Sequence, residues 1–360
     1  MSYELCSKVK TLEPYEPISG SYSIRLDANE SFYNMPENIK DEIKTIIDDL
    51  DFNRYPDPKA HDLAVSFSRY YGIDPENVTV TNGSDEMLYL LSSAMLQRGS
   101  RVCVTEPDFS MYDFYSYLSE NEILIYKKDD NLDINTDDLI SFVNENKADM
   151  LIFSNPCNPT GRGISYDDAI KLVENTDCLV VLDEAYMDFW DQSVINMASR
   201  YENLIVLKTA SKAVGAAAVR LGFAVANEKI TKALQSVKSP YNVNTLSQRI
   251  GECIYNNQDE IRQRRDTIVK NTKELYKGLT ELQKSYSLPM KIYEPHTNFV
   301  FIEWDKAENV FDYLLKNSIA IRCFKKLSAL RITAGSSEEN EKMLSTFEKY
   351  IIEKLLTLNK

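Results

Sequence analysis

The sequence predicts an α/β protein with a large domain built on a mainly parallel sheet and a smaller α+β domain. Short apolar segments alternate with helical patterns up to about residue 245, an order typical of parallel strands connected by helices. A long polar stretch with a helical pattern follows, and further apolar segments come after it. We therefore expect a large domain over residues 31–260 and a small domain formed by residues 1–30 together with 261–360.

Nine apolar segments are candidate strands. Six belong to the large domain, and their β-branched, apolar composition is typical of strands buried on both faces. Three come after the polar stretch and suggest the sheet of the small domain. The nine segments span residues 102–104, 123–125, 151–153, 179–182, 204–207, 223–225, 298–303, 319–322 and 330–333.

The composition favours a soluble enzyme. Hydrophobic residues make up 43% of the chain and charged residues 27%, which is ordinary for a globular protein. A net charge of −14 argues against a nucleic-acid partner. No apolar run approaches the length of a membrane span, and the N-terminus shows no secretory signal. Six scattered cysteines and two histidines suggest free thiols in a cytoplasmic protein without a metal site.

Two hydroxyls, a lysine and an arginine lie close together in the sequence at 209–220. Thr209 and Ser211 precede Lys212, and Arg220 follows eight residues later, about two helical turns on. A lysine amine can condense with an aldehyde as a Schiff base, while hydroxyls and a guanidinium can bind a phosphate. The set therefore suits pyridoxal phosphate. A solvated loop lysine is the alternative.

An acidic residue ends the candidate strand at 179–182. Burial of Asp183 is costly unless it pairs with a cation, and the protonated pyridine nitrogen of pyridoxal phosphate is such a cation. Tyr186 lies three residues on and could hydrogen-bond the phenolic oxygen of the cofactor. The alternative is an aspartate that caps the next helix.

Two strand ends carry turns with unusual composition. The segment 155–161, Asn-Pro-Cys-Asn-Pro-Thr-Gly, has little conformational freedom, so the amide of Asn155 could also reach the phenolic oxygen. Its alternative is a structural loop. Gly83, Ser84 and Asp85 follow Val78-Thr79-Val80, and free backbone N–H groups there suit a phosphate. The alternative is an ordinary helix cap by Ser84.

Taken in order, these motifs resemble the fold-type-I pyridoxal phosphate aminotransferases, and most of all their histidinol-phosphate aminotransferase branch. The resemblance extends from about residue 15 to residue 340. It implies that the large domain binds the cofactor on a seven-stranded-type sheet between helices. The matching segments are Leu-Asp-Ala-Asn-Glu at 26–30, Arg-Tyr-Pro-Asp at 54–57, Asn-Gly-Ser-Asp-Glu at 82–86, Pro-Asp-Phe-Ser-Met-Tyr at 107–112, the turn at 155–161, Asp-Glu-Ala-Tyr at 183–186, Thr-x-Ser-Lys at 209–212 and Leu-Arg-Ile-Thr at 330–333.

The resemblance implies a role for each cofactor residue. Lys212 would form the Schiff base and move the proton, and Asp183 would keep the pyridine nitrogen protonated. Tyr112 would stack on the ring. The phenolic oxygen would be bound by Asn155 and Tyr186. The phosphate would be surrounded by Ser84, Asp85, Thr209, Ser211 and Arg220, and by Tyr55 of the neighbouring subunit, which implies a homodimer with a shared site.

Three residues are expected to bind substrate. The resemblance implies that Arg331 takes the α-carboxylate and that Asn29, in the segment 26–30, also faces the substrate. Arg322 resembles an arginine that helps bind the distal phosphate. The stretch between Arg322 and Arg331 is shorter than the family's usual Gly-rich loop, and Gly215-Ala216-Ala217-Ala218-Val219 has fewer glycines than is usual before Arg220.

We expect a transaminase that exchanges an amino group between histidinol phosphate and 2-oxoglutarate by a ping-pong mechanism. An aminotransferase for aromatic or other amino acids is one alternative. A threonine-phosphate decarboxylase-like lyase is another, because the Cα bond that stands perpendicular to the cofactor ring decides the reaction. A cofactor-binding regulatory module would need a further domain, for which we find no room before residue 15 or after residue 345.

Overall fold

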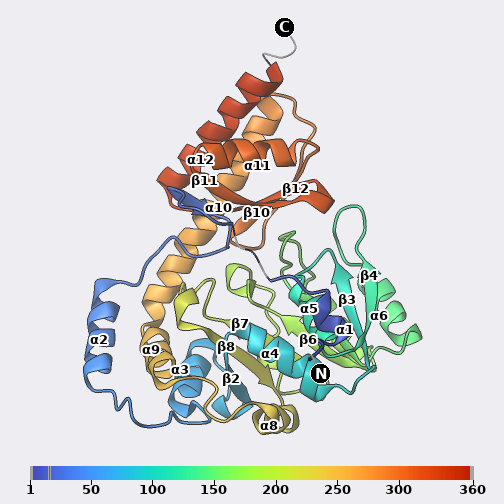
Figure 1. Cartoon of the computed structure of the whole chain (residues 1–360), viewed down its shortest axis with the longest axis vertical. Helices are drawn as coiled ribbons and strands as arrows, with labels where there is room; N and C mark the ends of the chain where they lie inside the picture. The colour runs from blue at the N-terminus through green and yellow to red at the C-terminus, as the bar shows by residue number, and fades with distance from the viewer. Residues whose placement is uncertain (1–2, 15, 17, 357–360) are drawn as a thin grey trace.

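The computed structural model describes residues 3–14, 16 and 18–356, which form two sheets with helices packed around them (Figure 1). The larger sheet has seven strands in the order β2-β8-β7-β6-β5-β3-β4. Strands β7, β6, β5, β3 and β4 are parallel to one another, whereas β8 is antiparallel to β7 and β2. The strands are β2 (Val78–Asn82), β3 (Arg101–Glu106), β4 (Glu122–Lys127), β5 (Met150–Ser154), β6 (Leu179–Asp183), β7 (Leu204–Thr209) and β8 (Leu221–Ala226).

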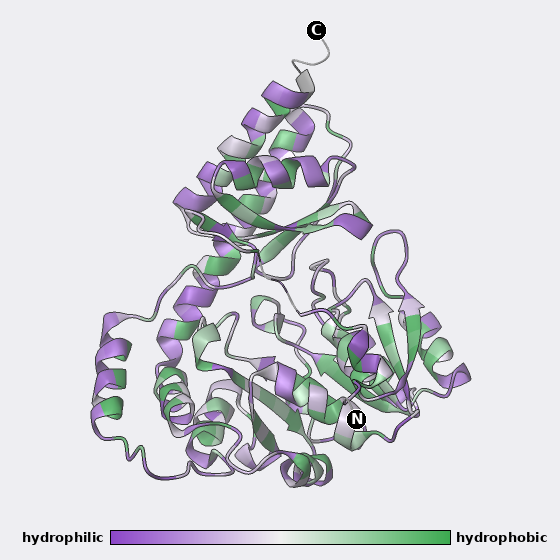
Figure 2. Cartoon of the chain, in the orientation of Figure 1, coloured by the Kyte–Doolittle hydropathy of each residue, from purple (hydrophilic) through white to green (hydrophobic). Residues whose placement is uncertain are grey.

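The expected α/β fold with a mainly parallel sheet is therefore confirmed, and all six candidate strands of the large domain are present. The central strands are buried on both faces, which explains their unbroken apolar sequences. Every residue of β5 and β7 is buried, and a hydrophobic core lies on each side of the sheet. Figure 2 shows these strands as largely hydrophobic.

The helices of this part connect the strands and cover the sheet. Most of their outward-facing residues are polar, as the purple helix faces in Figure 2 show. These helices are α2 (Glu37–Asp48), α3 (His61–Tyr71), α4 (Ser84–Leu90), α5 (Met111–Leu118), α6 (Thr136–Glu145), α7 (Tyr166–Glu174), α8 (Glu228–Val237) and α9 (Thr245–Asn256), and the short α1 (Ser7–Lys10) lies near α5.

The second sheet has five strands in the order β1-β11-β12-β10-β9. Strand β1 is parallel to β11, and the other pairs are antiparallel. Helices α10, α11 and α12 share a hydrophobic core with one face of this sheet. The elements are β1 (Ile24–Leu26), β9 (Lys291–Tyr293), β10 (Phe299–Glu303), β11 (Ile319–Phe324), β12 (Ala329–Thr333), α10 (Gln258–Ser285), α11 (Ala307–Lys316) and α12 (Ser337–Tyr350).

Two strands and one long helix differ from what the sequence pattern indicates. Strands β1 and β9 have three residues each, too few for a periodic signal. The polar stretch after residue 245 is two helices, α9 and the 28-residue α10, and α10 extends about 42 Å from one sheet to the other (Figure 1). The expected domain boundary at 260/261 falls in its first turn, and residues 1–2, 15, 17 and 357–360 lie outside the described part of the chain. In that described part, no helix is both long and apolar enough to cross a membrane.

A buried ion cluster joins the ends of β6 and β7. The amine of Lys208 lies 3.0 Å from a carboxylate oxygen of Asp188 and 3.2 Å from one of Glu184. Tyr71 of α3 donates a hydrogen bond to Asp188 at 2.9 Å, and Ser193 donates one to Glu184 at 2.6 Å. One ammonium group thus offsets the charge of two buried carboxylates, which would otherwise repel each other.

We predict that Lys208→Met lowers the free energy of unfolding by about 3–5 kcal/mol, because it leaves two carboxylates buried without their cation. Chemical denaturation of the purified protein measures this change. Lys232→Met is the matched control, since Lys232 is exposed and pairs with Glu228 on the surface of α8. Equal midpoints for the two variants would show that the cluster contributes nothing to stability.

Candidate active site

Lys212 lies just beyond the end of β7, where the chain turns back toward β8. Its amine donates a hydrogen bond to the carbonyl of Ala28 at 3.2 Å and lies 5.6 Å from the centre of the Tyr186 ring. The expectation of two helical turns before Arg220 is wrong. Gly215 (φ +73°) and Arg220 (φ 57°) take left-handed conformations, so the chain forms a loop with one 3₁₀ turn.

The residues expected around the phosphate lie at the ends of β2 and β7. The hydroxyl of Thr209 donates a hydrogen bond to the hydroxyl of Ser211 at 3.1 Å, and it accepts one from the Ser211 backbone at 3.2 Å. The guanidinium of Arg220 lies 3.5 Å from the carboxylate of Asp85, and both side chains are about half exposed. Four of the six expected phosphate residues therefore form two pairs, Thr209 with Ser211 and Arg220 with Asp85.

The turn before α4 packs closely against β8. A Cβ at Gly83 would lie 2.6 Å from an Arg220 nitrogen, and a Cβ at Gly222 would lie 2.5 Å from the backbone nitrogen of Ser84. Helix α4 follows Gly83 without any side-chain cap. The helix-cap alternative for Ser84 is therefore wrong, because Ser84 is already the first helical residue.

Asp183 ends β6 and is 4% exposed. Its carboxylate accepts hydrogen bonds from the Tyr112 hydroxyl at 2.8 Å and from the Ala185 backbone at 3.0 Å. Burial raises the pKa of Asp183 to about 6, although these hydrogen bonds act in the opposite direction. No cation of the described residues forms an ion pair with it. The Asp183 site can therefore accept a positive charge from a ligand.

Asn155 begins the Asn-Pro turn next to Asp183, and its backbone N–H donates to the Asp183 carbonyl at 2.9 Å. Its side chain exchanges two hydrogen bonds with the backbone of Ile164, at 2.9 and 3.2 Å. A Cβ at Gly163 would lie only 2.5 Å from the Asn155 amide oxygen. The sheet and this turn together fix the orientation of the amide.

A network of amides and hydroxyls links the two sheets. Asn29, buried with a φ of 55°, donates to the Tyr186 hydroxyl at 2.8 Å and accepts from the Thr333 hydroxyl at 3.0 Å. Asn298 donates to the Asn29 carbonyl at 3.1 Å. The amide oxygen of Asn298 is buried and has no hydrogen-bond partner among the described residues.

The two arginines expected to bind substrate lie directly opposite each other. Arg322 of β11 pairs in register with Arg331 of β12, so both side chains leave the same face of the sheet. Arg331 donates hydrogen bonds to the carbonyl of Asp27 at 2.7 Å and to the amide oxygen of Asn158. Like charges in this arrangement repel, and an anion between them removes the repulsion.

Tyr55 lies apart from the other expected site residues. Its ring is 81% exposed and stacks on Tyr241 with the ring centres 4.6 Å apart. None of its contacts within the described part of the chain involves another expected site residue. The structure thus brings the remaining expected residues together at the edges of the two sheets and leaves Tyr55 on the surface.

Several residues of the site were not identified from the sequence. Asn158 contacts Arg331, and the repeat of Asn-Pro in the turn was a signal for it. Lys208 stands out as a lysine in an otherwise apolar strand, which indicates a buried ion pair. Gly163 offers no signal, because its importance depends on distant packing. As far as the chain is described, no group of His, Cys, Asp and Glu side chains could hold a metal ion.

We predict that Asp183→Asn makes the ligand-free protein about 3 kcal/mol more stable at pH 7. The folded pKa of about 6 exceeds the ordinary value of 3.8, so the stability contributed by protonated Asp183 is present below pH 3.8 and lost as the pH rises to about 6. Asparagine does not titrate. Denaturant unfolding at pH 4 and pH 7 measures the effect. The prediction would be contradicted if Asp183→Asn and the native protein differed in their free energy of unfolding by the same amount at both pH values.

A sequence profile for the aminotransferase class I and II family matches residues 22–347. A histidinol-phosphate aminotransferase of Clostridium novyi (strain NT) is 40% identical over 349 residues, which cover 96% of this chain and 97% of the relative. The crystal structure of histidinol-phosphate aminotransferase from Sinorhizobium meliloti in complex with pyridoxal-5'-phosphate has a TM-score of 0.86 at 19% identity, over 98% of each chain.

The same fold also occurs in a lyase. L-threonine-O-3-phosphate decarboxylase from Porphyromonas gingivalis has a TM-score of 0.78 at 21% identity, covering 92% of this chain and 100% of that one. Similarity of fold therefore does not separate the two reaction types. The profile match and the 40% identity do identify the lineage. The chain belongs to the aminotransferase class I and II family.

Proposed function

We propose that this pyridoxal phosphate-dependent transaminase exchanges an amino group between histidinol phosphate and 2-oxoglutarate. The similarity to the Clostridium novyi enzyme supports the substrate, and the observation that carries it is the pair of arginines at positions 322 and 331. Two guanidinium groups on one sheet face suit a phosphate monoester dianion. The planar fork of Arg331 suits the carboxylate of glutamate in the other half-reaction.

The residues present fit pyridoxal phosphate. Asp183 is a buried carboxylate without a cation partner in the described chain, which suits a protonated pyridine nitrogen. The hydroxyls of Thr209 and Ser211 and the guanidinium of Arg220 form a polar group that suits the phosphate. Lys212 supplies an amine close by. Each functional group of the cofactor thus has a chemically matching partner.

When bound, pyridoxal phosphate supplies an electron-withdrawing ring that stabilises negative charge at the substrate Cα. The amine of Lys212 would take a proton from that Cα and deliver it to the C4′ carbon of the cofactor. The Asp183 carboxylate keeps the ring nitrogen protonated, and the hydroxyl of Tyr112 supports this carboxylate in its ionised form. Tyr186 and Asn155 would donate hydrogen bonds to the phenolic oxygen of the cofactor.

Transamination requires that two substrates use one site in turn. Hydrogen bonds to Asp27 and Asn158 hold the Arg331 guanidinium, which can bind either a carboxylate or a phosphate. Arg322 lies opposite Arg331 in the sheet and would add a second positive charge for the phosphate. Asn29 contributes by orienting Tyr186.

Two alternatives remain distinct from this proposal. A lyase on the same fold would release CO₂ from a substrate with an α-carboxylate. In an aminotransferase for aromatic or other uncharged amino acids, the amino donor would carry a single anionic group, the α-carboxylate. The similarity to histidinol-phosphate aminotransferases over nearly the whole chain favours transamination of histidinol phosphate over both.

We also propose that the chain acts as a cytoplasmic homodimer with domains over residues 31–260 and over 1–30 with 261–360. The exposed rings of Phe52 and Tyr55 support a subunit contact through which Tyr55 reaches the partner's cofactor phosphate. Six free cysteines in the described chain agree with a reducing compartment. Light scattering that shows a fully active monomer at micromolar concentration would contradict the dimer.

Turnover of a panel of amino donors with 2-oxoglutarate tests the proposed function. The panel contains histidinol phosphate, phenylalanine, leucine and threonine phosphate, and the assays follow glutamate formation and CO₂ release. We expect the highest kcat/KM for histidinol phosphate with no CO₂. A clear preference for an aromatic or aliphatic amino acid would contradict the substrate, and CO₂ without glutamate would indicate a lyase.

We predict that Lys212→Ala lowers kcat by more than about a thousandfold while pyridoxal phosphate still binds, because the proton-transferring amine is lost. Borohydride reduction followed by peptide mass spectrometry should place the cofactor on Lys212 in the native protein and on no residue of the variant. Lys229→Ala, which changes an exposed lysine of α8, is the control. A cofactor found on another lysine would refute this role.

We predict that Arg331→Ala raises KM for glutamate and for histidinol phosphate together, by about ten- to a hundredfold, because both anions lose a charged donor pair. Arg331→Lys should restore only part of the loss, since an ammonium group lacks the planar fork. Steady-state kinetics measure both, with the surface variant Arg98→Ala as control. Unchanged glutamate kinetics would place the anion site elsewhere.

A further inference from the structure

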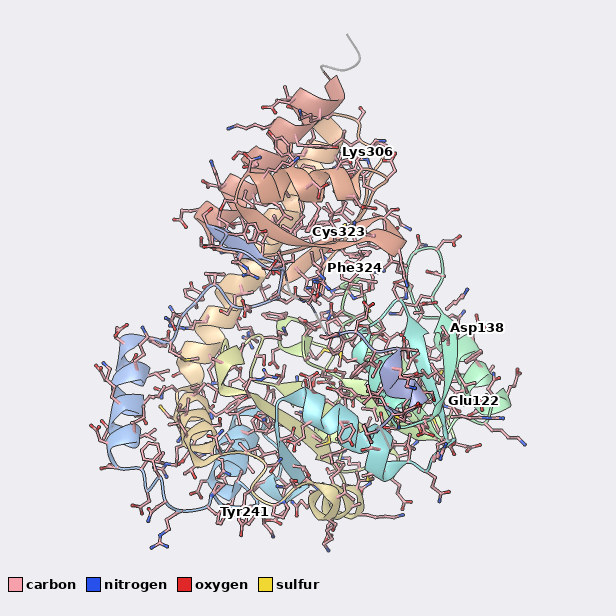
Figure 3. All side chains as sticks on the ribbon, viewed as in Figure 1. Glu122, Asp138, Tyr241, Lys306, Cys323 and Phe324 are labelled. Carbon is pink, nitrogen blue, oxygen red and sulfur yellow. The ribbon has the colours of Figure 1, made fainter. Side chains whose placement is uncertain are left out.

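One face of the five-stranded sheet combines charged and aromatic side chains. The register places Arg322 opposite Arg331, Phe324 opposite Ala329, and Phe301 opposite Arg331. Because side chains alternate along a strand, these residues share one face, while the residues between them enter the core under α10, α11 and α12. Figure 3 labels Phe324 on the side of this sheet that faces the larger sheet.

The guanidinium of Arg331 lies between two aromatic rings. Its central carbon is 5.3 Å from the centre of the Phe299 ring and 5.7 Å from that of the Phe324 ring, both within the range of a cation–π contact. The Phe324 ring is itself held edge-on against Phe301, with the ring centres 6.1 Å apart. Ala329, opposite Phe324, is small enough to leave room for this ring.

The two rings differ in what else they contact. Phe299 is completely buried and packs edge-on against Tyr186, so a change there would also disturb the cofactor site. Phe324 is partly exposed and contacts Arg331 and a small cluster formed by Tyr293, Phe301 and Ala329, none of which is an expected site residue. It lies at the end of β11, directly before the 3₁₀ turn at 325–327. Phe324 is therefore the ring whose effect on Arg331 can be isolated.

We propose that Phe324 is a positioning residue for the substrate anion: its ring holds the Arg331 guanidinium in the plane in which its fork receives the anion. The inference rests on the proposed function in that Arg331 binds the anionic group of the substrate. Without the ring, the hydrogen bonds to Asp27 and Asn158 remain, but the repulsion between Arg322 and Arg331 acts against this orientation with one contact fewer to oppose it. Preorganisation of the fork lowers the entropy lost on binding.

The test compares two substitutions that keep a large side chain in place. Phe324→Leu fills much of the same volume without an aromatic face, whereas Phe324→Tyr keeps the face. Leu327→Ala, in the adjoining turn, is the matched control because Leu327 is a surface residue of the same hairpin. Each variant is prepared as the holoenzyme, whose cofactor phosphate group is already bound.

Two probes measure the effect on the anion site. The half-reaction of the holoenzyme with glutamate alone is a single turnover, so the cofactor absorbance gives its maximal rate constant, the kcat of this half-reaction, and its half-saturating glutamate concentration, the corresponding KM. Calorimetry gives the Kd of inorganic phosphate. For Phe324→Leu we expect KM and the phosphate Kd each to rise about three- to thirtyfold, with kcat and cofactor content unchanged within about twofold. Phe324→Tyr and Leu327→Ala should both match the native enzyme.

Three results would overturn the inference. They are an unchanged phosphate Kd in Phe324→Leu, equal losses in Phe324→Leu and Phe324→Tyr, and a fall in kcat and cofactor content with KM unchanged, which indicates a general structural role. A native enzyme that does not react with glutamate at all contradicts the proposed function instead. In that case the phosphate titration by itself decides the role of Phe324.

Discussion

A carboxylate buried at the end of a central parallel strand is the constraint on which the site depends. Asp183 is nearly inaccessible, and its ionised form is unfavourable there without a positive partner. Two hydrogen bonds offset part of this cost, but the raised pKa shows that they do not remove it. The stability of the seven-stranded sheet holds the carboxylate in place, and a cationic ligand group then completes the site.

The segment that follows β1 connects the parts that must act together. The carbonyl of Asp27 accepts from Arg331, the carbonyl of Ala28 accepts from Lys212, and Asn29 donates to Tyr186. Three successive residues therefore contact the five-stranded sheet, the loop after β7 and the turn after β6. This arrangement explains how an N-terminal strand of three residues can matter to a site built mostly from residues far along the chain.

Much of the fold follows from local sequence. The apolar, β-branched sequences of the buried strands predict strand structure directly. Polar residues that follow these strands, such as Asp183 and Asn155, indicate a functional site at that edge of the sheet. The sequence is less informative where local signals are weak. Strands β1 and β9 are held by pairing rather than by their own pattern, and the loop before Arg220 depends on left-handed residues that a helical spacing does not reveal.

The family resemblance grouped the site residues, but the individual contacts between distant segments were not predicted. The packing of Gly163 against Asn155, the ion cluster around Lys208 and the rings on either side of Arg331 depend on which strands become neighbours and in which register. The alignment of Arg322 with Arg331 is of this kind, since a shift of one residue would turn one arginine to the opposite face. Family resemblance suggested these two arginines, but only the register shows that they share a surface.

The central claim is that Asp183 is a buried anion whose partner is the pyridine nitrogen of the cofactor. A ¹³C NMR titration of its carboxyl carbon, in protein labelled at aspartate and assigned with Asp183→Asn, tests this most directly. In the ligand-free protein the midpoint should lie near pH 6. With pyridoxal phosphate bound, Asp183 should stay ionised across that range, because a neighbouring cation lowers the pKa of a carboxyl group. The same midpoint with and without the cofactor would contradict the account.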